Sequence, residues 1–119
     1  MDSLNLTQLP PLRNSEQIYK RLGVSAEQIS EFCQEWKIIE LALFGSVLRN
    51  DFNEGSDIDF LYVSSSEAHW GWKVVTLIEQ LEKLVGREVD FVSKESIVNS
   101  HNWIRRRNIL GSAEVIYGT

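Results

Sequence analysis

The chain of 119 residues is poor in cysteine and proline. Its one cysteine, Cys33, excludes an internal disulfide, and free thiols are typical of a reducing compartment. Because Cys33 falls within a helical pattern, we expect a small buried side chain rather than a reactive thiol. Both prolines, Pro10 and Pro11, lie in residues 1–14, a segment that we expect to be extended.

Long apolar runs and an excess of positive charge are also missing. No apolar run approaches the length of a membrane-spanning helix, and residues 1–5 lack the basic and apolar pattern of a signal peptide. The net charge of -5 argues against a direct nucleic-acid partner, because domains that bind nucleic acids are usually basic. With 43% apolar residues the chain can bury a real core, so we expect one soluble, cytoplasmic domain over 1–119.

The most informative stretch joins two apolar runs. Residues 38–44 lead into Gly45-Ser46, and after a polar loop the chain resumes with Asp57-Ile58-Asp59 and the apolar residues 60–63. This pattern predicts a strand, a tight turn with a short helix over 47–50, a loop and a second strand. Side chains alternate along a strand, so Asp57 and Asp59 face the same way while Ile58 faces a core.

Both halves of this stretch predict ligand chemistry. Two adjacent carboxylates repel each other unless a cation lies between them, and hard divalent cations such as Mg²⁺ take oxygen ligands of this kind. Gly45 allows the backbone to approach a ligand closely, and Ser46 lies where a helix begins, where free N–H groups favour an anion such as phosphate. Carboxylates that bind metal beside a turn that binds phosphate indicate a nucleotide site.

The pattern of Gly-Ser, ten residues and Asp-x-Asp resembles the signature of the DNA-polymerase-β-type nucleotidyltransferases. The short chain resembles their minimal nucleotidyltransferase (MNT) subfamily, typically antitoxins paired with HEPN-domain ribonuclease toxins. The resemblance covers roughly residues 37–117. In the family an arginine follows Gly-Ser by a few residues, and Arg49 fits this place, although Leu48 and Asn50 stand where the family often has a small residue and a glycine.

A third carboxylate comes from a later strand. Asp90 points opposite to Val89 and Phe91 in the predicted strand over 88–92, so it can face the site, although an exposed strand residue on a solvated face is the alternative. The resemblance implies that Asp90 completes the metal site with Asp57 and Asp59. It further implies two Mg²⁺ ions, with ATP as substrate held by Gly45, Ser46 and Arg49.

The remaining pattern predicts an α/β (α+β) fold. Helices are expected over residues 15–22, from a capping box at Ser25 and Gln28 to about residue 36, and along the apolar stripe that ends at Gly86. A further helical segment follows Ser93, and a strand closes the chain near residues 114–117. We expect a small nucleotidyltransferase fold: N-terminal helices over 15–36, a catalytic core over 37–117, and a mixed four- to five-stranded sheet with helices mainly on one side.

Other residues leave alternatives open. Trp70 and Trp72 could stack on adenine or dock a partner, but packing at a helix start is as strong a prediction for Trp70 and a stronger one for Trp72. The arginines of residues 105–107 could grip a triphosphate or an acidic partner, but they point in different directions, which favours a solvated helix end.

The resemblance implies a type VII-like antitoxin that transfers AMP from ATP to a tyrosine of its HEPN toxin, in a hetero-oligomer with that toxin. Two alternatives remain. The protein could be a binding module that occludes the toxin without catalysis, or an enzyme that modifies the hydroxyl of a small molecule. The intact set of carboxylates argues against the first, since unused carboxylates at one site only cost stability.

Overall fold

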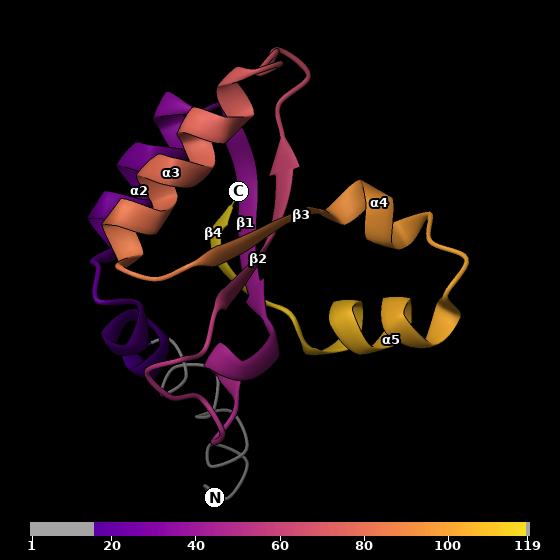
Figure 1. Ribbon diagram of the computed structural model, residues 1–119. Helices are drawn as coiled ribbons and strands as arrows, with labels where there is room; N and C mark the ends of the chain where they lie inside the picture. Colours follow the sequence, from indigo (N-terminus) through magenta and orange to yellow (C-terminus); the bar gives the residue numbers. More distant parts are fainter. Residues whose placement is uncertain (1–15, 119) are drawn as a thin grey trace, which may run out of the picture.

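The computed structural model describes residues 16–118 and is built around a four-stranded sheet with the strand order β3-β2-β1-β4 (Figure 1). The strands are β1 (Ile38–Phe44), β2 (Ile58–Ser64), β3 (Val89–Ser93) and β4 (Glu114–Gly118). β1 pairs antiparallel with both β2 and β4, whereas β2 and β3 are parallel. This mixed sheet confirms the predicted fold class. Residues 1–14, for which we expect an extended conformation, lie outside the described residues.

One face of the sheet carries the main helical layer. It consists of a helical segment over 16–22, α2 (Ala26–Glu35) and α3 (Lys73–Val85), and α2 and α3 lie side by side to the left of the sheet in Figure 1. These helices bury apolar side chains against alternate residues of β1 and β2. The fully buried members of this core include Leu22, Ile29, Cys33, Leu41, Leu43, Ile58, Phe60, Leu77 and Leu81.

A smaller pair of helices covers part of the other face. α4 (Lys94–Val98) and α5 (Trp103–Ser112) project to the right of the sheet in Figure 1, and we call this pair the α4–α5 arm. The prediction of helices mainly on one side therefore describes the larger layer. The arm is held by a second cluster with four buried members, Ala42, Leu61, Ile97 and Ile109. Ala42 in β1 and Leu61 in β2 alternate with the core residues of these strands, so the two clusters lie on opposite faces of the sheet.

Local signals in the sequence set the helix ends. The hydroxyl of Ser25 accepts from the N–H of Gln28 at 3.1 Å, and the amide oxygen of Gln28 accepts from the N–H of Ser25 at 2.9 Å, which confirms the capping box. α3 ends at Gly86, as the sequence predicts. Cys33 is buried, and burial raises the pKa of its thiol to about 12, so it packs as an apolar side chain. None of the helices within residues 16–118 has the length and apolar character needed to cross a membrane.

Three local expectations need correction. The short helix expected over 47–50 is a single 3-10 turn, η1 (Gly45–Leu48), that starts two residues earlier. The segment after Ser93 forms two helices separated by residues 99–102, because the side chain of Asn102 caps a new helix by accepting from the N–H of Arg105. The side chain of Trp72 is 92% exposed, so the expected packing of this residue is wrong.

Candidate active site

The turn after β1 is shaped around one carboxylate. Gly45 has a φ of 80°, and a Cβ at this position would collide with Oδ2 of Asp59. Only glycine combines this backbone conformation with the missing side chain that Asp59 requires. No side chain among the described residues caps the N-terminal end of η1, so the leading N–H groups of the turn stay open to a ligand. Gly45 thus joins the two halves of the motif physically.

Asp59 and Asp90 are neighbours in the sheet. They are register partners across the parallel β2–β3 pair, and their side chains are hydrogen-bonded to each other. Each lies between residues that pack into the large core, so both carboxylates point to the opposite face, the face that carries the α4–α5 arm. The structure therefore brings together the two carboxylates that the alternation pattern places on separate strands.

The electrostatics of Asp59 reflect this crowding. Burial, followed by the hydrogen bond with Asp90 and the negative charges of Asp90 and Asp57, raises the pKa of Asp59 to about 6. The positive charge of Arg49 lowers it in part. A hydrogen bond between two carboxyl groups requires a proton on one of them. Above a pH of about 6 Asp59 is ionised, and its negative charge is then repelled by those of Asp90 and Asp57.

The other two predicted residues lie at the rim. Asp57 is exposed at the last position before β2, close enough for its charge to act on Asp59. The guanidinium of Arg49 forms an exposed ion pair with Asp51 at 3.1 Å and also acts on Asp59. Ser46 is half-buried in η1. The predicted residues thus gather around Asp59 from one turn and two strands.

A divalent cation fits this set of donors. A carboxylate such as Asp59, whose pKa is raised beside a second carboxylate, gains most from a cation that replaces its proton. Within residues 16–118, however, no three acidic, histidine or cysteine side chains already converge as a preformed metal cage. Asp59 and Asp90 would form the fixed part of a metal site, and the exposed Asp57 would turn inward to complete it.

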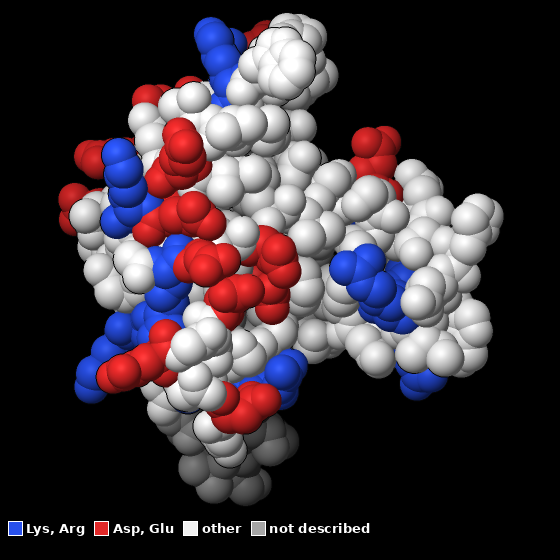
Figure 2. Space-filling model, viewed as in Figure 1, with Lys and Arg blue, Asp and Glu red and all other residues white. Residues whose placement is uncertain are grey.

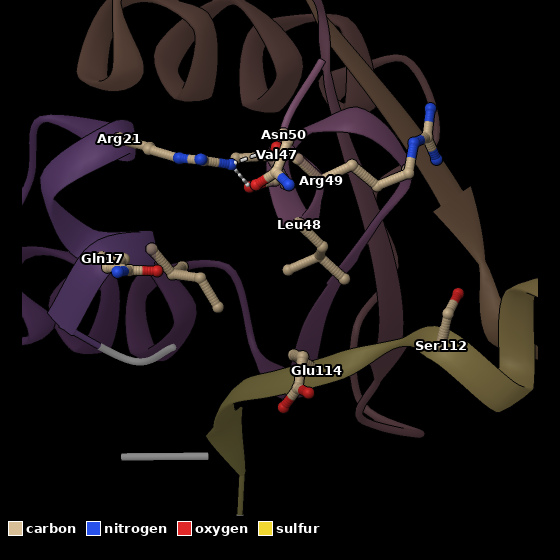
Figure 3. Close-up of a pocket in the computed structure, with 10 residues that line it drawn as sticks. Gln17, Arg21, Val47, Leu48, Arg49, Asn50, Ser112 and Glu114 are labelled. Carbon is tan, nitrogen blue, oxygen red and sulfur yellow. Dashed lines mark hydrogen bonds between the residues drawn. The ribbon is translucent and has the colours of Figure 1, made fainter. Parts of the chain in front are cut away.

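A cavity of about 340 Å³ lies beside the Gly45 turn, and Gly45 and Arg49 are among the residues that line it. Figure 3 shows that it opens between the helical segment 16–22, the turn with Arg49, and the start of β4 at Glu114. Arg21 reaches across it and donates to the carbonyl oxygens of Val47 and Arg49. The sequence offers no sign of this contact, because every residue carries such a carbonyl.

Of the tryptophan and arginine side chains considered as possible ligand or partner contacts, some make structural contacts and others are exposed. Trp70 packs against Tyr62 and Phe91, and its Nε1–H donates to the carbonyl of Trp36 at 2.9 Å, so it belongs to the core layer. Arg106 donates to the carbonyl of Ser100 at 2.6 Å within the arm. The neighbouring Arg105 and Arg107 are exposed, which confirms that the three arginines point in different directions.

The nucleotidyltransferase domain model matches residues 25–116. Protein adenylyltransferase MntA of Thermococcus cleftensis is 37% identical over 67 residues, which cover 56% of this chain and 67% of that protein. A Methanocaldococcus jannaschii protein, provisionally named a protein adenylyltransferase, is 39% identical over 74 residues, or 56% of this chain and 68% of that protein.

Solved structures share the fold. One described provisionally as a minimal nucleotidyltransferase has a TM-score of 0.58 at 27% identity and covers 74% of this chain and 85% of its own. A toxin–antitoxin complex with AMP-PNP has a TM-score of 0.57 at 20% identity, over 81% and 75% of the two chains. A Shewanella oneidensis complex of an MNT antitoxin with a tri-AMPylated HEPN toxin has a TM-score of 0.52 at 19% identity, over 79% and 70%. The family model, the curated relatives and the shared fold agree: this chain belongs to the nucleotidyltransferase domain family.

Proposed function

We propose that this protein is an antitoxin that transfers AMP from ATP to a tyrosine of a HEPN-domain ribonuclease and thereby silences it. The observation that carries the proposal is the pairing of Asp59 with Asp90 on adjacent parallel strands, directly beside the turn at Gly45. The names of the relatives as protein adenylyltransferases, and of the structural neighbours as toxin–antitoxin complexes, support the same activity.

Each residue has a defined part in this proposal. Asp59 and Asp90, joined by Asp57, would hold Mg²⁺, most simply as two ions in line with the general design of such sites. The open N–H groups of the turn at Gly45 and Ser46 would bind the outer phosphates of ATP. Arg49 would leave its exposed ion pair with Asp51 and add positive charge beside the triphosphate.

In the reaction the tyrosine oxygen attacks the α-phosphorus of ATP. The new P–O bond forms as the bond to pyrophosphate breaks, and the phenolic proton leaves to a base. The metal-bound state would supply charge stabilisation for the attacking and leaving oxygens. Asp90 would accept the proton directly or through water, and its exposed carboxylate on the open face beside Asp59 supports this role.

The α4–α5 arm favours a protein as the acceptor. It lies on the same face of the sheet as the carboxylates, α4 follows directly after the strand with Asp90, and α5 ends at the cavity beside Arg49. At its far end Trp103 and Ile104 are 57% and 55% exposed. A ten-residue helix is about 15 Å long, so these side chains lie too far from the site for a small acceptor to contact both.

The charge of the surface agrees with this view. Figure 2 shows most acidic side chains over the body of the molecule, with basic ones among them, whereas the arm carries a group of basic side chains and one acidic group at its upper edge. α5 contains three arginines and no acidic residue. Apolar and arginine side chains next to one another are typical of protein interfaces. A protein that docks on the arm would present a tyrosine to the neighbouring carboxylates.

The test is a transfer assay with ATP, Mg²⁺ and the HEPN-domain product of the adjacent reading frame. Intact-mass spectrometry would follow the acceptor, with Asp57→Ala as the inactive control. We expect the acceptor to gain the mass of AMP with the wild-type protein and to stay unchanged with the variant. Tight binding without a mass change would overturn the enzymatic proposal in favour of an antitoxin that only occludes its toxin.

A further inference from the structure

The loop between η1 and β2 connects the turn that would bind phosphate to the first metal-binding aspartate. Most of residues 49–57 are exposed, so the loop buries little apolar surface of its own. Segments with few buried contacts open readily. Local hydrogen bonds around Asn53 shape the middle of the loop, for example from the N–H of Gly55 to Oδ1 of Asn53 at 2.8 Å. Such bonds set the form of the loop but do not fix it to the body of the protein.

Two arginines from distant parts of the chain make that connection. Arg21 donates from Nη1 to the carbonyl oxygens of Val47 at 2.7 Å and Arg49 at 2.6 Å, at the start of the loop. Arg87 donates from Nη1 to the carbonyl oxygen of Asn53 at 2.7 Å, in the middle of the loop, and to that of Ser56 at 2.9 Å, near the end of the loop. Hydrogen bonds from a charged donor are the stronger kind, and here four of them hold one loop.

Phe52 links the two arginines. The guanidinium carbon of Arg87 lies 4.3 Å from the centre of its ring, and that of Arg21 lies 5.4 Å from it. Both distances are within the range of cation–π attraction. Phe52 also packs against the large core. An apolar side chain in an otherwise polar loop thus provides a common contact for both cations, so the three side chains act as one unit.

We propose that Arg21, Phe52 and Arg87 form a clamp that positions the Gly45 turn and Asp57 for nucleotidyl transfer. This inference rests on the proposed function of the same site. Arg21 lies before residue 25, where the match to the family model begins. The N-terminal helical segment therefore contributes half of the clamp from outside the matched domain. The three side chains are positioning residues, since they act on the site through loop carbonyls and through each other.

The experiment measures the loop and the nucleotide separately in Arg21→Gln and Arg87→Gln. Amide hydrogen exchange of residues 49–57 reports the order of the loop without any acceptor protein. Binding of ATP with Mg²⁺, and kcat and KM in the transfer assay, report the site. Tyr19→Phe is the matched control, because it removes another donor of the same helical segment that binds a distant carbonyl oxygen, that of Ile116 at 2.9 Å, outside the loop. Arg87→Lys keeps the charge and one donor and tests for partial rescue.

We expect exchange in the loop to rise by about tenfold or more in both glutamine variants, because the ordered loop becomes a minor population. For the same reason the apparent Kd and KM for ATP should rise by about tenfold, while kcat at saturating ATP changes little, since nucleotide selects the ordered loop. Tyr19→Phe should change neither the loop exchange nor the affinity for ATP, and Arg87→Lys should restore part of both.

Two results would overturn the clamp. One is unchanged loop exchange in Arg21→Gln and Arg87→Gln, whether or not the protein transfers AMP. The other is an equal rise of the KM for ATP in Tyr19→Phe, which would reduce the effect to a general loss of stability. If no AMP transfer occurs with any variant, the exchange and ATP-binding data still decide the clamp, so its failure and the failure of the proposed function can be distinguished.

Discussion

Within residues 16–118, fifteen buried side chains join one face of the sheet to α2, α3 and the helical segment before them, whereas four hold the α4–α5 arm to the other. The carboxylates Asp59 and Asp90 lie on the second, thinly covered face. A group that must exchange a proton, bind a cation and meet a substrate cannot be buried in an apolar core without a large cost. The division of the sheet therefore assigns stability to one face and leaves the other open for chemistry.

The largest expected difference between the faces is in stability. Ile29 in α2 and Ile97 in α4 are matched isoleucines, exposed by 0% and 1%, that lie in the large and the small cluster. Replacing Ile29 by alanine should cost about 3–5 kcal/mol in the free energy of unfolding, because the dense core cannot close the cavity. Ile97→Ala should cost about 2 kcal/mol, since the short α4 can shift into the space. Urea unfolding of both variants measures the difference, and equal losses would contradict the division.

The next prediction concerns the turn that connects the faces. Gly45→Ala places a Cβ at a φ of 80° and against Oδ2 of Asp59, whereas Gly23→Ala meets only the strain of a φ of 71° with no atom within 4 Å. The strain alone costs about 1–2 kcal/mol in each variant. Only Gly45→Ala should also displace Asp59 and abolish ATP-dependent transfer. Loss of transfer in Gly23→Ala, or normal transfer in Gly45→Ala, would contradict the conclusion that the missing side chain at Gly45 positions Asp59.

Much of this arrangement could be predicted from the sequence because the signals are local. The capping box at Ser25, the end of α3 at Gly86 and the alternation around Asp59 and Asp90 each depend on a few neighbouring residues. These signals are enough for the strands, two helices and the orientation of the carboxylates. They do not contain the parallel register that makes Asp59 and Asp90 partners, because that register joins two strands that are far apart in the sequence.

The contacts that could not be predicted are made to backbone groups, which are the same in every residue. Arg21 and Arg87 recognise backbone carbonyls, so the loop sequence does not mark them as partners. The apolar character of Trp72 likewise wrongly favours packing, although this residue is 92% exposed in the folded chain. Residues that act through the backbone are therefore the part of a site that only the folded chain reveals.

The pH dependence of the free energy of unfolding reports the protonation of Asp59 on the open face. Since the pKa of Asp59 is raised to about 6, the native state holds its proton more tightly than the unfolded chain does. The free energy of unfolding should therefore fall as the pH rises from the ordinary range of an aspartate to about 6. Asp59→Asn should flatten this fall and be more stable than the wild-type protein at pH 7. Urea unfolding of both proteins at pH 4 and pH 7 tests the sign, and parallel slopes would contradict it.

Added Mg²⁺ extends the same measurement. A cation that takes the place of the shared proton should stabilise the wild-type protein more at pH 7 than at pH 5, because below pH 6 the proton competes with it. Asp59→Asn should lose most of this stabilisation. A magnesium effect that is the same at both pH values would indicate binding away from the paired carboxylates.

The smallest effect on stability is expected at the tip of the arm. Trp103 is 57% exposed, and changes at exposed positions usually alter the free energy of unfolding by less than about 0.5 kcal/mol. If the arm docks the acceptor protein, Trp103→Ala should nevertheless raise the Kd and KM for that protein by about tenfold or more, as truncation of an aromatic anchor does. Trp72→Ala removes a similar side chain, 92% exposed, that lies before α3 outside the arm, and it should leave acceptor affinity unchanged. Neither tryptophan belongs to the large core, so the comparison does not depend on a loss of stability. Equal affinities of both variants for the acceptor would show that the acceptor does not dock on the arm, even if the carboxylates prove essential.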